Sequence, residues 1–238
     1  SICIDWGYFY LSGLNGNLCL GSDAAIKDAF VADGKLPASE KKVVCRKPSQ
    51  MPTLAYCHDL GSTHQASSYT MVGYDEIWDI EYFYKRYKAY WAHNGRVSIF
   101  KMFDQLANNY DSNMQRSRRQ DKTIYDDGFA AGGTKYAEIL SASYRHVNAA
   151  HKLFQDDEGN ILFFSKENNS NGCVNTVDLT YPESPLYLCY DPTLQKGMMT
   201  SIFEYSYSGR WTKPFAAHDL GQYPKANKQV YGGDMPLE

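Results

Sequence analysis

The sequence predicts a mainly α-helical protein that is preceded by a short β-rich segment. Bulky residues recur at every second position from Ile2 to Tyr10, which is the period of a half-buried strand. From about residue 74 onward, apolar residues recur at spacings of three and four, which is the period of a helix. The 238 residues, 43% of them hydrophobic, suffice for one large or two small domains with a buried core.

Residues 1–60 are expected to form strands and loops around one short helix. Ser22 or Asp23 can cap the start of that helix, because short polar side chains accept hydrogen bonds from the first free N–H groups. Gly34 is expected to end it, and Pro37 follows.

The remainder of the chain is expected to hold four helices and one hairpin. The apolar spacing predicts helices over residues 74–95, 98–128, 132–155 and 191–209. The last of these opens with Asp191 as a cap and Pro192 as its first residue. A β-hairpin is expected to turn at Gly159. Such helices, joined by long polar loops, favour a layer of paired helices with the loops gathered at one end.

Composition excludes several classes of function. The net charge of −3 gives no basic footprint for nucleic acid, and no stretch approaches the ~18 apolar residues of a membrane span. The six cysteines form no C-x-x-C pair, which argues against a zinc site or a thioredoxin motif. Phosphate-loop, HExxH and GxSxG patterns are absent, so no cofactor and no metal are predicted. The 20 tyrosines suit a small-molecule or sugar site.

The two ends of the sequence suggest a piece of a longer polypeptide. The chain has no initiator Met and no signal peptide, and a strand pattern begins at its first residue. It stops at "YGGDMPLE" without a terminating element. We therefore expect further domains of the same polypeptide as partners.

Residues 163–185 read "FFSKENNSNGCVNTVDLTYPESP" and pack polar side chains densely between apolar flanks. Glu167 and Asp178 are joined by Asn- and Gly-rich chain that must turn, so both carboxylates can reach one cleft. Cys173 lies in this stretch, but a nucleophilic cysteine needs a base and a lowered pKa. The alternative is a turn-rich surface loop whose side chains cap helices and satisfy backbone groups.

Five stretches resemble the fungal and bacterial glutaminase A family. They are "IDWGYFYL" (4–11), "GYDEIWDIEYF" (73–83), "LSASYRHVNAAHKL" (140–153), the polar stretch at 163–188 and "GRWTKPFAAHDLGQYPKANKQVYGGDMPLE" (209–238). The resemblance implies that residues 1–50 are the remnant of an upstream β-sandwich. It implies that residues 51–238 are part of a six-hairpin α/α toroid-like domain. It also implies a secreted or periplasmic hydrolase that converts L-glutamine to L-glutamate and ammonia.

Amide hydrolysis needs an activated water, a proton donor for the leaving ammonia and donors for the oxyanion. The candidate catalytic residues are Asp178, Glu167, His218 and Asp219. Asp178 is the preferred acid, because "TVDLTYP" is similar to the acid-bearing loop of some helical-toroid glycosidases. His218 and Asp219 can supply a base and the group that orients it.

The candidate substrate-binding residues are Lys166, Asn168, Asn171, Tyr181 and Tyr223. A lysine can bind the α-carboxylate of glutamine, and asparagine amides both donate and accept hydrogen bonds.

Two other functions stay open. A glycoside hydrolase-like toroid that acts on sugars would use the aromatic residues and the paired carboxyls. A non-catalytic fragment would arise if the site is completed by segments outside the chain. Separately, Asp75 and Asp79 would share one face of the helix expected at 74–95 and could hold a cation, although a solvated helix face is the more frequent outcome.

Overall fold

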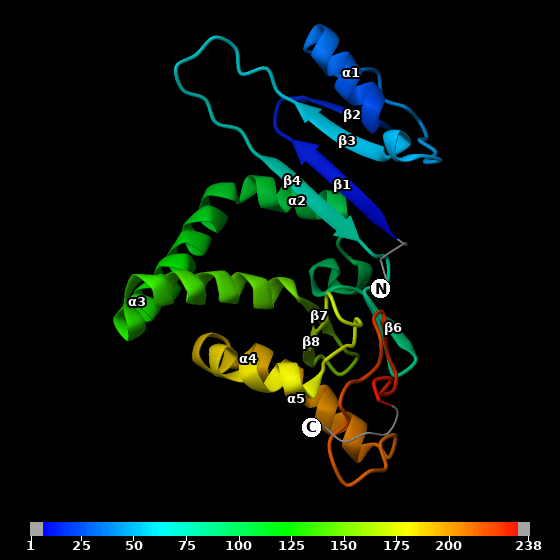
Figure 1. Cartoon of the computed structure of the whole chain (residues 1–238), viewed down its shortest axis with the longest axis vertical. Helices are drawn as coiled ribbons and strands as arrows, with labels where there is room; N and C mark the ends of the chain where they lie inside the picture. Colours follow the sequence, from blue (N-terminus) through cyan, green and yellow to red (C-terminus); the bar gives the residue numbers. More distant parts are fainter. Residues whose placement is uncertain (1–6, 233–238) are drawn as a thin grey trace. The chain divides into compact units, whose positions relative to one another are not determined.

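The computed structural model describes residues 7–232. Their contacts divide the chain into two compact units, Gly7–Asp75 and a second unit that begins at Glu76 (Figure 1). The boundary predicted between residues 50 and 51 falls inside the first unit. The two units do not test where the domains of the whole polypeptide divide, so the boundary between residues 50 and 51 stays a prediction.

The first unit contains two antiparallel strand pairs and a helix. Strand β1 (Tyr8–Gly13) pairs with β4 (Thr70–Asp75), and β2 (Asn17–Ser22) pairs with β3 (Pro52–Cys57). A short 3-10 helix, η1 (Pro48–Gln50), precedes β3. Helix α1 (Asp23–Asp33) begins where the Ser22 hydroxyl accepts from the Ala25 N–H. It ends at Gly34, whose φ of 66° is left-handed, so both predicted ends of this helix are confirmed.

The helix predicted over residues 74–95 is wrong. Strands β5 (Ile80–Tyr82) and β6 (Lys85–Tyr87) form a tight hairpin here, and the 3-10 helix η2 (Tyr90–Gly95) follows. Phe83 and Tyr84 occupy the turn with φ of 43° and 68°. Strand β5 also pairs in parallel with β9 (Lys225–Ala226), so a partner from a distant part of the sequence holds it extended.

The helices predicted over 98–128 and 132–155 are recovered with different ends. Helix α2 (Ile99–Asn108) stops one residue before α3 (Tyr110–Ala149) begins. Inside α3 the backbone leaves helical geometry at Gly132 and Gly133, where the second φ is 74°. The two arms fold back on one another (Figure 1). They approach closely beside this bend, since a Cβ added at Gly128 would lie 2.8 Å from the Cα of Ala137. The second arm ends at Ala149, because the next residues form a strand.

The predicted hairpin and the last predicted helix are confirmed. Strands β7 (His151–Gln155) and β8 (Ile161–Ser165) pair around the expected turn. Helix α5 (Pro192–Tyr207) is capped by the Asp191 carboxylate, which accepts from two backbone N–H groups. Helix α4 (Val177–Tyr190) was not predicted, because Pro182 and Pro185 lie inside it.

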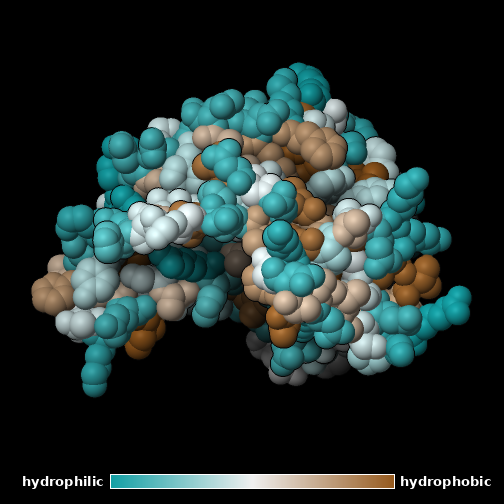
Figure 2. Space-filling model, turned by 90° about the horizontal axis from the view of Figure 1, so that it is seen from above, coloured by the Kyte–Doolittle hydropathy of each residue, from teal (hydrophilic) through white to brown (hydrophobic). Residues whose placement is uncertain are grey.

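The core of the second unit lies between the strands and α5. Gly197 brings α5 onto β8 so closely that an added Cβ would lie 2.9 Å from the carbonyl oxygen of Ile161. Phe154, Phe164 and Trp211 are among the buried aromatic side chains there. Apolar side chains also reach the surface, where they lie among polar ones (Figure 2).

The predicted helical character is confirmed, whereas the six-hairpin toroid stays a prediction. None of the helices in residues 7–232 is both long and apolar enough to cross a membrane.

Candidate functional site

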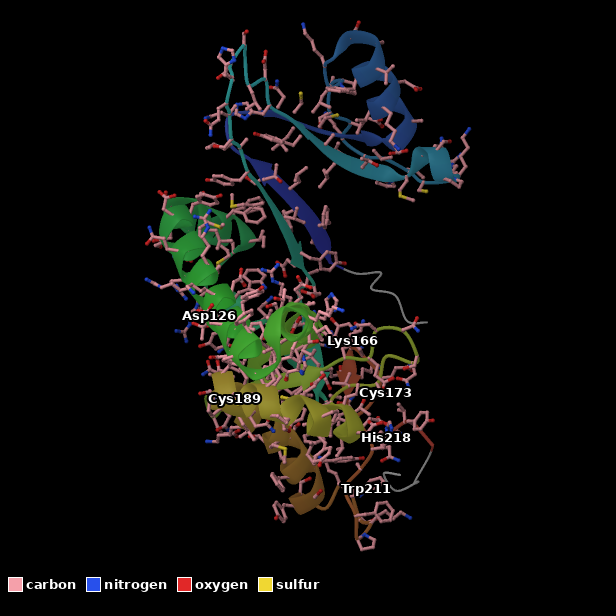
Figure 3. The ribbon with its side chains drawn as sticks, turned by 60° about the vertical axis from the view of Figure 1, so that its left-hand side comes forward. Asp126, Lys166, Cys173, Cys189, Trp211 and His218 are labelled. Carbon is pink, nitrogen blue, oxygen red and sulfur yellow. The ribbon has the colours of Figure 1, made fainter. Side chains whose placement is uncertain are left out.

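Three short segments lie side by side in the second unit: residues 165–167, residues 172–177, and residues 218–223 from a distant part of the sequence. Lys166, Cys173 and His218, one from each segment, lie on the same side of the unit (Figure 3). The backbone bonds that join the segments are Glu167 N to Cys173 O (3.0 Å), Val174 N to Gly221 O (2.8 Å), Leu220 N to Val174 O (3.0 Å) and Val177 N to His218 O (2.9 Å). The fold therefore brings the polar stretch and the second "HDLG" segment together.

His218 lies between two carboxylates. Its Nδ1 is 3.1 Å from Oδ2 of Asp219, and its Nε2 is 3.9 Å from Oδ1 of Asp178. His218 is therefore hydrogen-bonded to Asp219, whereas its separation from Asp178 is too long for a direct hydrogen bond. The imidazole stacks on Tyr231, with the ring centres 4.5 Å apart. These contacts fix the ring so that one nitrogen faces the interior and the other faces the exposed Asp178.

Asp219 is the buried anchor of this arrangement. Its side chain is fully buried and accepts backbone N–H groups from Gly221 (2.8 Å), Val230 (3.1 Å) and Tyr231 (3.1 Å). The carboxylate thus ties together the loop that carries His218. These three backbone donors, together with Nδ1 of His218, satisfy the buried carboxylate.

Asp178 faces His218 from the start of helix α4, and Glu167 contacts Thr176, the residue immediately before that helix. Asp178 is in the first turn of α4, where the partial positive charge of the helix end favours a carboxylate. Its side chain is 55% exposed, so it is open to a ligand. Glu167 accepts hydrogen bonds from the hydroxyls of Thr176 (3.2 Å) and Ser170, which hold its carboxylate in place.

Cys173 is a thiol and not a nucleophile in this setting. Burial raises its pKa to about 12, and the negative charges of Asp219 and Glu167 act in the same direction. A thiolate is therefore disfavoured at neutral pH. Asp178 also acts on this thiol, so Cys173 marks the place where the three acidic side chains Asp219, Glu167 and Asp178 converge.

Lys166 and Lys152 both lie close to the ring of Tyr223. The Nζ atom of Lys166 is 5.1 Å from the centre of the Tyr223 ring, and Nζ of Lys152 is 5.3 Å from the same centre. Tyr223 is only 1% exposed, and burial raises its pKa to about 12. Its ring is thus part of the core, and direct contact of its hydroxyl with a substrate stays a prediction.

The other predicted binding residues occupy the rim. Asn168 is exposed in the loop after Glu167, and Tyr181 is 81% exposed on α4. Asn171 shapes the backbone, because its Oδ1 accepts from the Cys173 N–H at 2.7 Å. The amide nitrogens of both asparagines can still face a ligand.

Sequence reasoning missed a buried charge cluster beside Tyr223. Lys152 on β7 donates to a carboxylate oxygen of Glu76 and to Oδ1 of Asp79 at 3.0 Å. Burial raises the pKa of Asp79 to about 6, although Lys152 acts in the opposite direction. The idea that Asp75 and Asp79 share a helix face is wrong, because these residues lie on strand β4 and immediately before strand β5.

Comparison with known proteins identifies the class of this fold and site. Residues 133–238 match the model of the Glutaminase A six helical-hairpin domain, and residues 1–127 match a Domain of unknown function (DUF5127). Glutaminase A of Aspergillus oryzae is 31% identical over 252 residues, which cover 98% of this chain and 35% of that protein. The chain belongs to the glutaminase A family.

A second relative supports the same family over a shorter length. A probable glutaminase of Arthroderma benhamiae is 28% identical over 125 residues, which cover 51% of this chain and 14% of that protein. The chain therefore spans about a third or less of the length of these two relatives. No solved structure matches the chain.

Proposed function

We propose that the chain carries the hydrolytic site of a glutaminase, which converts L-glutamine to L-glutamate and ammonia. The observation that carries this proposal is the line formed by Asp219, His218 and Asp178, in which a buried and an exposed carboxylate flank the two nitrogens of one imidazole. The names of the two relatives support the choice of glutamine as substrate.

In this proposal His218 is the general base. When Asp219 accepts the Nδ1 proton, the lone pair of the neutral imidazole is on Nε2, which faces Asp178. Nε2 takes a proton from the water that attacks the amide carbon. Asp178 then relays this proton from Nε2 to the departing ammonia, and the gap of 3.9 Å between Nε2 and Oδ1 of Asp178 leaves room for a bridging water.

The remaining residues bind and orient the substrate. Lys166 supplies a cation for the α-carboxylate of glutamine, and Glu167 supplies the second carboxylate of the site. Asn168, Asn171 and Tyr181 offer hydrogen-bond donors on the exposed side. The burial of Asp219 and the stacking of Tyr231 on His218 keep the base in one orientation, which is what a preorganised site requires.

The scaffold and the location complete the proposal. The two arms of α3 form one helical hairpin, and α4 with α5 forms another, joined by Asp191 alone. We propose that they belong to a six-hairpin toroid completed by other parts of the polypeptide. An extracytoplasmic location is proposed on the resemblance to the family.

A ligand panel on the purified chain tests this function. Thermal unfolding is measured with L-glutamine, L-glutamate, and a set of mono- and disaccharides. A ligand at 100 times its Kd adds about 2.7 kcal/mol to the free energy of unfolding, which raises the unfolding temperature by several degrees. We expect a shift with glutamine or glutamate, no shift with the sugars, and no shift in Lys166→Ala, whereas Asp178→Asn keeps the binding residues and should still show the shift.

The matched control is Asp104→Asn, which removes an exposed carboxylate on α2 and should respond like the wild type. A shift with sugars alone would favour the glycoside hydrolase alternative. Unchanged unfolding with every ligand would favour a non-catalytic fragment, and a glutamine shift that persists in Lys166→Ala would contradict the assigned site.

A further inference from the structure

One sequence pattern that the proposed reaction does not use is the acceptor pattern for N-linked oligosaccharides. It reads N-x-S or N-x-T, where x is any residue except proline. Among the asparagines of the 238 residues, Asn168 alone begins such a pattern, which continues with Asn169 and Ser170. A pattern this short also arises by chance, so the structure around Asn168 decides whether the position can carry an oligosaccharide.

Residues 168–171 form the tip of a loop that is closed at its base. Lys166 and Val174 pair there as an isolated antiparallel bridge, and the N–H of Glu167 donates to the Cys173 carbonyl at 3.0 Å. The labelled Lys166 and Cys173 mark the two ends of this loop (Figure 3). The tip itself belongs to neither a helix nor a strand. A group attached at the tip therefore leaves the pairing at the base intact.

The side chain of Asn168 is exposed at this tip, and the fold does not use it. It makes no hydrogen bond with any residue between 7 and 232, so its amide group is free to carry a substituent. The next two residues, Asn169 and Ser170, are exposed as well. A bulky, hydrated group on Nδ2 of Asn168 can therefore extend into solvent without displacing a packed side chain.

Another asparagine of the same stretch shows the opposite situation. Asn175 is 0% exposed, and its Nδ2 donates to the Met198 carbonyl at 2.9 Å and to Oγ of Ser201 at 2.8 Å. A substituent on that nitrogen would break buried hydrogen bonds, which is costly. A substituent on Asn168 breaks none, so the sequence pattern falls on an asparagine that tolerates it.

We propose that Asn168 accepts an N-linked oligosaccharide when the chain passes through a eukaryotic secretory pathway. The donor is an oligosaccharide joined through its C1 atom to a lipid diphosphate. Nδ2 of Asn168 forms a bond to C1 and gives up one proton, while the bond between C1 and the diphosphate oxygen breaks and the lipid diphosphate leaves. Use of this site in the cell rests on the extracytoplasmic location proposed above, whereas the ability to accept the sugar does not.

The hydroxyl of Ser170 indicates when the transfer takes place. This hydroxyl is part of the acceptor pattern, but in the folded loop it donates to the carboxylate of Glu167. The transfer is therefore expected before the loop folds, while the hydroxyl is still free. Once the loop has folded, the exposed position of Asn168 leaves the linked sugar in solvent.

The oligosaccharide would stand at the rim of the proposed hydrolytic site. Glu167, the residue before Asn168, accepts from the hydroxyl of Thr176 immediately before helix α4. The linked amide of Asn168 keeps its oxygen and one N–H, so it can still hydrogen-bond a small substrate. The modification thus goes beyond the proposed glutaminase reaction and does not depend on it.

Secretion of the whole chain from a eukaryotic host tests the proposal. A cleavable secretion signal directs the chain into the pathway, and mass spectrometry measures the intact secreted product. We expect the mass to increase by one oligosaccharide per chain, and peptide N-glycosidase should remove this increase. Because that enzyme converts the linked asparagine to aspartate, peptide mapping should find the conversion at position 168 alone.

Three variants locate the acceptor. Asn168→Gln removes the acceptor amide and Ser170→Ala removes the hydroxyl of the pattern, so both should lose the oligosaccharide. Asn169→Gln is the matched control, because the middle position of the pattern accepts glutamine, and this variant should keep the oligosaccharide. Thermal unfolding of the same variants, produced without glycosylation in bacterial cytoplasm, shows whether each one folds.

An unmodified mass of the secreted wild type would overturn the proposal. An oligosaccharide that persists in Asn168→Gln or Ser170→Ala would overturn it too, because another position would then be the acceptor. Loss of the oligosaccharide from a normally folded Asn169→Gln would contradict the role of the pattern.

Discussion

The substitution Asp219→Asn tests the structural part of the site most sharply. Oδ1 of Asp219 accepts the N–H groups of Gly221 and Val230, and Oδ2 accepts the N–H of Tyr231 and faces Nδ1 of His218. Asparagine keeps one acceptor oxygen and replaces the other by an NH₂ donor. Whichever way the amide turns, its NH₂ group faces backbone N–H donors, and up to two of the four interactions are lost.

The expected magnitude follows from these contacts. A hydrogen bond to a charged group contributes about 1.5–3 kcal/mol, so two losses amount to about 3–6 kcal/mol of the free energy of unfolding. In a unit of this size, 1 kcal/mol shifts the unfolding temperature by about 2–4 °C, which predicts a decrease of roughly 10 °C.

Tryptophan fluorescence in a urea titration measures this change. Trp78, Trp91 and Trp211 all belong to the second unit, so their signal reports the unfolding of that unit. The control is Asp178→Asn, whose side chain is 55% exposed and which should lose less than about 1 kcal/mol. If Asp219→Asn also loses less than about 1 kcal/mol, Asp219 does not anchor the His218 loop.

Three further predictions concern other positions. Gly221→Ala should destabilise the second unit far more than Gly209→Ala in chemical denaturation. Both residues have positive φ, but a Cβ at Gly221 would lie 2.2 Å from the Lys225 carbonyl oxygen, whereas Gly209 faces open space. Equal losses of stability in the two variants would contradict the close contact. The folded-state pKa of Asp79 is raised from 3.8 to about 6, so the free energy of unfolding should fall by about 3 kcal/mol as pH rises from 4 to above 6. Asp79→Asn should flatten that part of the curve of stability against pH. An unchanged curve in this variant would count against the buried cluster. Pro185→Ala should stabilise α4 by at least about 1 kcal/mol in thermal unfolding, because the proline is exposed and interrupts the backbone hydrogen bonds inside the helix. A loss of stability would contradict this prediction and would show that the proline ring makes a stabilising contact.

Elements with local start and stop signals could be predicted from the sequence. Helix α1 carries Ser22 and Gly34 at its ends, and α5 carries Asp191 and Pro192 at its start, so each boundary is set by neighbouring residues. The β7–β8 hairpin turns at a glycine between two apolar runs, which is likewise a local signal.

Two elements depend on information that is not local. The spacing of tyrosines and isoleucines at 74–95 fits a helix, but parallel pairing with β9 holds β5 extended. Helix α4 contains Pro182 and Pro185, which would break an isolated helix, so its packing against α5 and α3 must maintain it. Tyr190 at its end donates to Asp127 of α3 at 2.9 Å.

The candidate site divides in the same way. His218 and Asp219 are sequence neighbours, so their pairing could be anticipated, and the turn-rich chain between Glu167 and Asp178 indicated that both carboxylates can reach one place. The Lys152 cluster could not be anticipated, because its two acids lie 73 and 76 residues away along the chain. Only the fold brings them together.

Release of ammonia from L-glutamine by the purified chain tests the central claim most directly. If the Asp219–His218–Asp178 line is the catalytic site, the wild type releases ammonia, and His218→Gln and Asp178→Asn each lower the rate by about 100-fold or more. The exposed control Asp104→Asn should keep the wild-type rate. Absence of ammonia release by the wild type, or wild-type rates in both site variants, would contradict the account.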